Sequence, residues 1–96
     1  DRKAQTEEKI RRGRVLRDTR QLIEKLEKKI SGAEDRMSIL EIELSKVEVF
    51  SDPEKMKTAS IEYSRLRERL SDYYQRWEEA QQKHEELQEL LERKEI

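Results

Sequence analysis

The side chains best suited to chemistry in this chain are one histidine, many carboxylates and many basic groups. His84 is the sole histidine and cysteine is absent, so neither a catalytic triad nor a metal site of histidines and cysteines can be assembled. The carboxylates are expected on convex helical surfaces, which lack the pocket that general acid–base catalysis needs. We therefore expect a binding protein with no catalytic residue, no cofactor-binding residue and no metal ligand.

Basic and acidic residues are concentrated at opposite ends of the chain. Residues 9–20 contain six basic residues and one acidic residue, whereas residues 78–96 contain seven glutamates and three basic residues. If these segments lie side by side, they neutralise each other on a solvated stem. The alternatives are that the arginine run attracts a nucleic-acid backbone or another protein.

The composition favours long helices. Of the 96 residues, 47% are charged and 32% are hydrophobic, so the chain would be disordered unless its few apolar residues are periodic. Only two glycines and one proline interrupt it, which leaves no room for a β-fold with many turns. The absence of cysteine fits a reducing cytoplasmic setting, and no apolar run is long enough to cross a membrane.

Apolar residues recur at alternating steps of three and four along two stretches. The first seam is Leu16, Thr19, Ile23, Leu26, Ile30, Ala33, Met37, Leu40, Leu44 and Val47; the second is Met56, Ala59, Tyr63, Leu66, Leu70, Tyr73, Trp77, Ala80, His84, Leu87 and Leu91. Charges between such positions over more than three heptads are typical of a coiled coil. The sequence therefore predicts two long amphipathic helices.

The segment between the seams predicts that the chain folds back. Pro53 suits the first position of a helix, and that helix is capped either by Asp52 or by a capping box of Ser51 and Glu54. If Val47 faces Met56, the remaining seam positions also pair, down to Thr19 with His84 as a polar layer that sets the register. A short connection makes the helices antiparallel neighbours, whereas Pro53 disfavours one continuous helix in a parallel dimer.

We therefore predict an all-α fold, a two-helix antiparallel coiled-coil hairpin. A single domain covers residues 1–96, with helix one over about 5–48, a turn over about 49–52 and helix two over about 53–93. Because the chain begins with Asp1 rather than methionine, we expect it to be a piece of a longer protein.

Charges beside the seams indicate where a partner would bind. One edge of the predicted hairpin is acidic on helix one, at Glu27, Glu34 and Glu41, with Arg67 opposite. The other edge, called the basic edge, brings Lys29 and Arg36 against Arg69, Arg76 and Lys83. Like charges there do nothing for stability, but phosphate contacts would need them. The predicted nucleic-acid-binding residues are Arg11, Arg12, Arg14, Arg17, Arg20, Lys29, Arg36, Arg69, Arg76 and Lys83.

Aromatic and apolar residues off this edge have alternative interpretations. Tyr73 and Trp77 occupy seam positions and are expected in the core, whereas Tyr74 lies one step off the seam and either covers the edge or stacks on bases. Near the turn, five apolar residues fall outside the seam; they cover the hairpin tip or form a contact patch. They are Ile39, Ile42, Val49, Phe50 and Ile61.

Several segments together resemble the C-terminal coiled-coil domain of ABC-F ATP-binding proteins of the Uup-like group. They are residues 22–30, residues 40–44, the loop Phe50-Ser51-Asp52-Pro53, Tyr63 and Leu66, and residues 74–79, which include Arg76-Trp77-Glu78-Glu79. The resemblance covers roughly residues 10–88. Ala80 departs from the family, which usually has leucine after the two glutamates.

The resemblance implies a cytoplasmic parent with two ATP-binding cassettes that acts on ribosomes or nucleic acid. ATP and magnesium are expected only in those cassettes, because this chain has no Walker A glycine loop. The expected partner is DNA or ribosomal RNA, bound without sequence specificity. The alternative is a structural or protein-interaction hairpin that contacts the parent's ATPase domains or self-associates through its tip.

Overall fold

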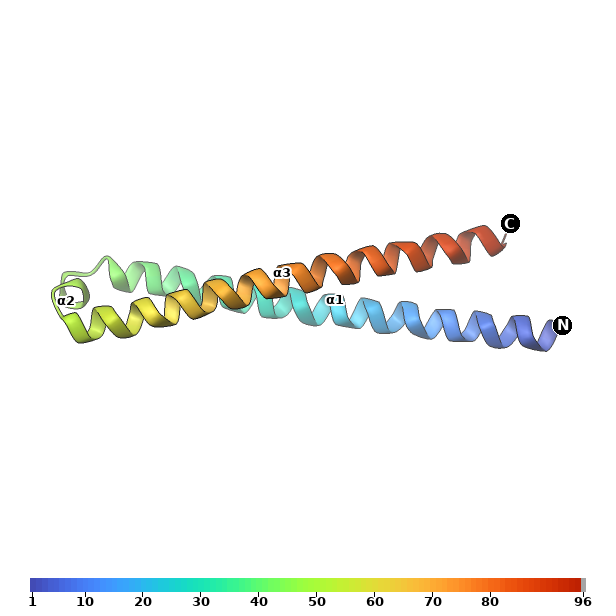
Figure 1. Ribbon diagram of the computed structural model, residues 1–96, viewed down its shortest axis with the longest axis horizontal. Helices are drawn as coiled ribbons and strands as arrows, with labels where there is room; N and C mark the ends of the chain where they lie inside the picture. Colours follow the sequence, from blue (N-terminus) through green and yellow to red (C-terminus); the bar gives the residue numbers. More distant parts are fainter. Residues whose placement is uncertain (96) are drawn as a thin grey trace. The chain divides into compact units, whose positions relative to one another are not determined.

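The computed structural model consists of three helices (Figure 1), and it describes residues 1–95, with the side chains of residues 1–93. Helix α1 spans Arg2–Leu44, α2 spans Val47–Phe50 and α3 spans Pro53–Glu95. No strand occurs among the described residues. The predicted all-α class is confirmed.

Helix α1 ends earlier than the predicted boundary of about residue 48. The amides of Ser45 and Lys46 bond to carbonyls only three residues back, at 3.2 and 3.1 Å, so the last turn tightens before the helix stops. Lys46 then adopts an extended conformation, with ψ of 136°. The single turn of α2 follows, which heptad spacing alone did not predict.

Helix α3 begins where the proline predicts. Asp52 Oδ1 accepts hydrogen bonds from the amides of Glu54 and Lys55, at 3.0 and 3.3 Å. Two of the amides that lack a partner at a helix start are thereby satisfied. Of the two caps considered, Asp52 is therefore the one used.

The described chain divides into two compact units, and each is taken by itself. Unit 1 comprises Asp1–Glu27 and Arg76–Ile96, and unit 2 comprises Lys28–Gln75. The single domain expected over residues 1–96 stays a prediction.

Unit 1 draws its buried residues from the predicted seams. Leu26 is 3% exposed and Ala80 5%. Thr19, also buried, has its Oγ1 2.7 Å from Nδ1 of His84, as the register alignment predicts. The same hydroxyl donates to the Leu16 carbonyl at 2.9 Å. The Thr19 hydroxyl is therefore hydrogen-bonded both to its own helix and to His84.

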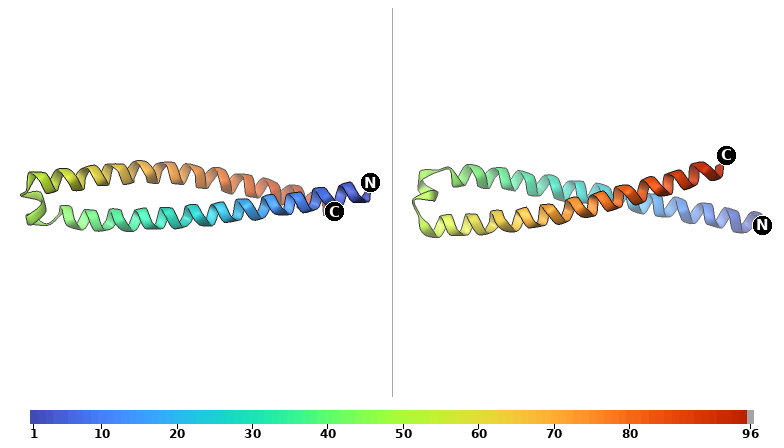
Figure 2. Two further views of the ribbon diagram at one scale, coloured as in Figure 1. Left: turned by 90° about the horizontal axis from the view of Figure 1, so that it is seen from below. Right: turned by 45° about the horizontal axis from the view of Figure 1, so that its top comes forward.

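Unit 2 contains α2 between the end of α1 and the start of α3, as both views in Figure 2 show. Its buried residues are Ile30, Ala33, Leu40 and Ala59, all on the predicted seams. The last predicted seam pair is wrong, because Val47 is 65% exposed and Met56 37%. Val47 belongs to α2 rather than α1, so the helical spacing does not continue to it.

Candidate nucleic-acid interface

The arginine run of unit 1 lies on α1 and is mostly open to solvent. Arg11, Arg14 and Arg17 are exposed and follow one another at steps of three residues. Residues three apart are neighbours on a helix surface, about 4.5 Å apart along the axis. No hydrogen bond or ion pair involves these three side chains within the described residues. We call Arg11, Arg14 and Arg17 the arginine stripe.

Other predicted residues of unit 1 differ in environment. Arg12 is half-buried, and its guanidinium donates to the carboxylate of Glu8 one turn earlier. Arg20, Arg76 and Lys83 are exposed. Arg12 is therefore engaged within the chain, whereas the arginine stripe presents unneutralised charge.

A further basic feature of unit 1 was missed by the sequence analysis. An open pocket of about 570 Å³ is lined by Arg2, Gln5, Thr6, Glu8, Lys9, Arg12 and Leu91. The signal was present: continuing the steps of three and four backwards from Leu16 leads to Arg12, Lys9, Gln5 and Arg2. The seam of α1 thus becomes basic towards its start, and Leu91 of α3 meets polar side chains there.

The basic edge of unit 2 does not consist of like charges alone. Arg36 donates to Glu62 through two bonds, Nε to Oε1 at 2.7 Å and a terminal nitrogen to Oε2 at 3.0 Å. This hydrogen bond raises the pKa of Arg36 and lowers the pKa of Glu62. The prediction that Arg36 faces only basic residues is wrong, because Glu62 occupies the place one heptad before Arg69.

The other two predicted cations of unit 2 remain accessible. Lys29 is exposed, with its Nζ 5.7 Å from the centre of the Tyr73 ring, a distance at which a cation interacts with an aromatic face. Arg69 is exposed and lines a shallow groove with Ile61, Arg65 and Leu66. A phosphate could reach both side chains without breaking an ion pair described for them.

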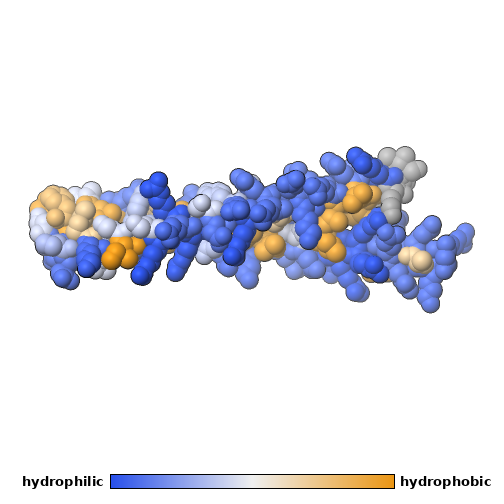
Figure 3. Space-filling view, in the orientation of Figure 1, coloured by the Kyte–Doolittle hydropathy of each residue, from blue (hydrophilic) through white to orange (hydrophobic). Residues whose placement is uncertain are grey.

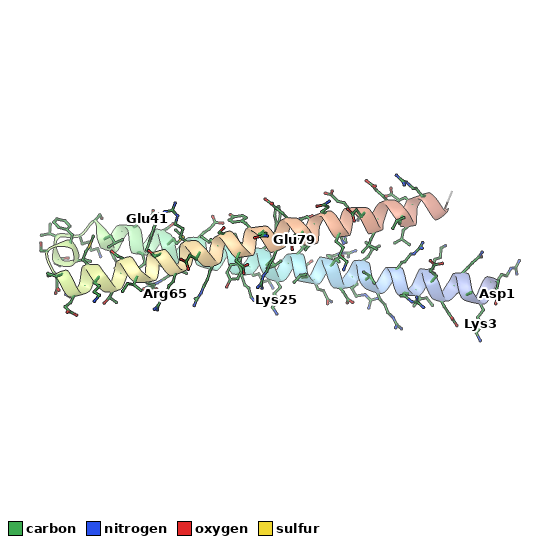
Figure 4. All side chains as sticks on the ribbon, viewed as in Figure 1. Asp1, Lys3, Lys25, Glu41, Arg65 and Glu79 are labelled. Carbon is green, nitrogen blue, oxygen red and sulfur yellow. The ribbon has the colours of Figure 1, made fainter. Side chains whose placement is uncertain are left out.

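Tyrosine hydroxyls, rather than Arg67, bond to the acidic edge of unit 2. Tyr63 donates to Glu41 at 3.0 Å, and Tyr74 donates to Glu34; Figure 4 draws these side chains and labels Glu41. Each bond raises the pKa of its tyrosine, because the neighbouring carboxylate disfavours the phenolate. Tyr74 is thus tied to the edge, although 43% of it is exposed.

The two seam aromatics, expected in the core, are half-buried rather than buried. Tyr73 lies beneath Lys29, and Nε1 of Trp77 is buried without a hydrogen-bond acceptor among the described residues. Their partial burial does not favour these two rings as stacking platforms for bases.

The apolar residues around α2 are largely uncovered. Ile39, Ile42, Phe50 and Ile61 are between 42% and 60% exposed, and Figure 3 shows hydrophobic surface around α2. Only Val49 is half-buried. This exposure favours the interpretation of these residues, apart from Val49, as a contact patch.

Two other features are absent from the described residues. No group of three or more histidine, cysteine, aspartate or glutamate side chains is arranged to hold a metal ion. No helix in that part of the chain is long and apolar enough to cross a membrane.

Comparison with known proteins identifies the family. Residues 16–82 match the ABC transporter C-terminal domain. This range is more than half of the chain and includes the first seam, the turn and the second seam as far as Ala80. No curated protein and no solved structure matches significantly. The match confirms the resemblance drawn from the residues around Pro53 and Trp77. The chain belongs to the ABC transporter C-terminal domain family and is a non-catalytic C-terminal part of an ABC protein.

Proposed function

We propose that this domain is the nucleic-acid-contacting arm of a cytoplasmic ABC-F-type ATPase, built as an antiparallel coiled-coil hairpin. ATP and magnesium act only in the cassettes of the parent protein. The arm binds DNA or ribosomal RNA through the phosphate backbone and does not read base sequence.

The cross-helix contacts of unit 2 support the antiparallel part of this proposal. Glu41 pairs with Tyr63 and Glu34 with Tyr74. The residue earlier in α1 therefore contacts the residue later in α3, as in an antiparallel pair. Lys29 over Tyr73 also joins an earlier residue of α1 to a later residue of α3 than the pair of Glu41 and Tyr63 does. In unit 1 the pairing of Thr19 with His84 has the predicted register.

The arginine stripe is the observation that carries the nucleic-acid part. A chain with a net charge of −1 has no general attraction for a polyanion, so any binding must be local. Three exposed guanidinium groups without an internal partner provide such a place, because each can release a counterion from a phosphate. Arg20, Lys29, Arg69 and Lys83 add exposed charge, whereas Arg12 and Arg36 would first have to leave their glutamates.

The first prediction concerns duplex DNA of arbitrary sequence. If about five phosphates are engaged, the logarithm of affinity falls with the logarithm of salt concentration at a slope of about −4. Replacing Arg11, Arg14 and Arg17 by glutamate should abolish most of the binding and make the slope shallower by about 3. Fluorescence anisotropy between about 50 and about 200 mM salt measures both quantities.

A matched control separates the effect of the arginine stripe on binding from the effect of net charge. Replacing Lys55, Lys57 and Arg65 by glutamate changes the net charge by the same amount at exposed positions of unit 2. Binding should survive this change, apart from a modest general weakening. Equal loss in both triple variants, or binding that ignores salt, contradicts the proposal.

The exposed apolar residues of unit 2 favour the second candidate, a protein-interaction hairpin without nucleic-acid contact. In that case substitutions at Ile42 and Phe50 abolish binding of the partner, and the arginine stripe can be reversed without effect. Binding of the isolated domain to DNA at low salt would argue against this candidate.

A further inference from the structure

The polar layer of unit 1 places two possible partners around one hydroxyl. Thr19 Oγ1 lies 2.9 Å from the Leu16 carbonyl and 2.7 Å from Nδ1 of His84. A hydroxyl has one hydrogen to donate, and a carbonyl oxygen has none. Both contacts can therefore be hydrogen bonds only if a second hydrogen comes from the imidazole.

The carbonyl decides which way each hydrogen points. Because the Leu16 carbonyl can only accept, the hydrogen of the Thr19 hydroxyl belongs to that bond. This back-bonding to the preceding turn is common for threonine in helices. The distance of 2.7 Å between Thr19 Oγ1 and His84 Nδ1 is that of a hydrogen bond. Its hydrogen must therefore come from Nδ1.

This direction of donation selects one tautomer of the neutral imidazole. A neutral ring carries one nitrogen-bound hydrogen, and here it resides on Nδ1, whereas a free histidine side chain carries it mainly on Nε2. Thr19 is 6% exposed and His84 is half-buried, so water is a poor substitute for the hydroxyl. An unpaired donor or acceptor would be costly at such a place.

We propose that His84 links α3 to α1 by donating from Nδ1 to Thr19 in both charge states of its ring. Protonation adds a hydrogen at Nε2 and leaves the hydrogen on Nδ1 in place. If Thr19 were the donor instead, protonation of Nδ1 would break the bond. The pairing of the two helices in unit 1 is therefore independent of the charge on His84.

The charged groups near this pair leave Thr19 as the partner of the ring. Within the described part of the chain, none of them forms an ion pair with His84. All are exposed, and three positive charges stand against three negative ones, so their fields largely cancel. Those within four positions of Thr19 or His84 are Arg17, Asp18 and Arg20 on α1 and Lys83, Glu85 and Glu86 on α3.

Nitrogen-15 spectra of the imidazole test the proposal, and the assignment is direct because His84 is the sole histidine. In alkaline solution, where the ring is neutral, the hydrogen should reside on Nδ1. T19S keeps the hydroxyl and should keep this tautomer. T19V removes the hydroxyl at nearly constant shape and should move the hydrogen largely to Nε2, with circular dichroism checking the helix content. A wild-type ring with its hydrogen on Nε2, or an unchanged tautomer in T19V, overturns the proposal.

Two further measurements keep the wild-type chain and a matched pair of variants in use. Emission of Trp77, the sole tryptophan, should stay constant while the nitrogen signals show His84 becoming charged. H84N retains a donor near the position of Nδ1 and should melt close to wild type at neutral pH. H84D has the same shape without the donor and should melt several degrees lower.

Two results would contradict the donor role of His84. One is a change in Trp77 emission that follows protonation in wild type and is absent from H84N. The other is equal melting of H84N and H84D. These results are independent of the proposed function, because no nucleic acid takes part in the measurements.

Discussion

For an individual cation in this domain, availability to a ligand depends on what its side chain already touches. Arg36 and Arg69 were equivalent in the sequence analysis, yet Arg36 is held by Glu62 through two bonds and Arg69 is exposed. Releasing Arg36 to a phosphate would leave Glu62 without its cation. Contact with a phosphate therefore costs more at Arg36 than at Arg69 or in the arginine stripe.

The pair of Arg36 and Glu62 predicts a dependence of stability on pH. The hydrogen bond from Arg36 lowers the pKa of Glu62 in the folded state. The stability that this pair contributes is therefore fully present above the pKa that Glu62 has in the unfolded chain, and it is lost as the pH falls through the pKa of Glu62 in the folded chain. E62Q should therefore lower the melting temperature slightly at neutral pH. E62Q should leave the melting temperature unchanged in acid, at a pH below the pKa of Glu62 in both the folded and the unfolded chain.

Circular dichroism melts of wild type and E62Q across this pH range provide the measurement. The effect is expected to be small because both side chains are more than 40% exposed, and water screens such pairs. E68Q, at another exposed position of α3, is the control and should match wild type at neutral pH. A difference between E62Q and wild type that persists in acid would assign the effect to something other than the ion pair.

Sequence reasoning was most successful where pairing follows from helical spacing. The contact of Thr19 with His84 could be predicted because both residues lie on seams with a common phase. The bonds of Tyr63 and Tyr74 to glutamates could not, because the reach of a phenol across an edge depends on its rotamer and not on spacing. Glu62 was available in the sequence but was not included among the edge positions.

At the scale of the element, termini were harder to predict than helices. The start of α3 at Pro53 follows from local chemistry, since a proline fits the first helical position and Asp52 fits the cap. The end of α1 at Leu44 does not, because no glycine or proline marks it. Two short backbone bonds and an extended Lys46 end the helix there, and a heptad pattern carries no information about them.

Removing the cap of α3 should destabilise the domain. D52A deletes the carboxylate that accepts from the amides of Glu54 and Lys55, and loss of such a cap costs about 1 kcal/mol. S51A should have little effect, since the Ser51 side chain makes no hydrogen bond among those described. Urea unfolding followed by circular dichroism compares the two. A larger loss in S51A would favour the capping box instead.

At the scale of the whole molecule, a net charge of −1 combines regions of opposite sign. The exposed glutamates of α3 in unit 1 include Glu85, Glu86 and Glu89. Their field opposes the approach of a polyanion to the arginine stripe of the same unit. Neutralisation of the arginine run by these glutamates and attraction of phosphates are therefore opposing tendencies, and ionic strength sets their balance.

Neutralising these glutamates should strengthen binding to nucleic acid. E85Q/E86Q/E89Q removes three negative charges from unit 1, and affinity for duplex DNA should rise several-fold at low salt. The gain should shrink at about 200 mM salt, where charges are screened beyond roughly 7–8 Å. Anisotropy titrations of this variant against E48Q/E54Q/E68Q, which makes the same change of net charge in unit 2, give the comparison. If local charge at the arginine stripe governs binding, the unit 1 variant gains more. Equal gains would mean that net charge alone sets the affinity, and the arginine stripe would then have no special role.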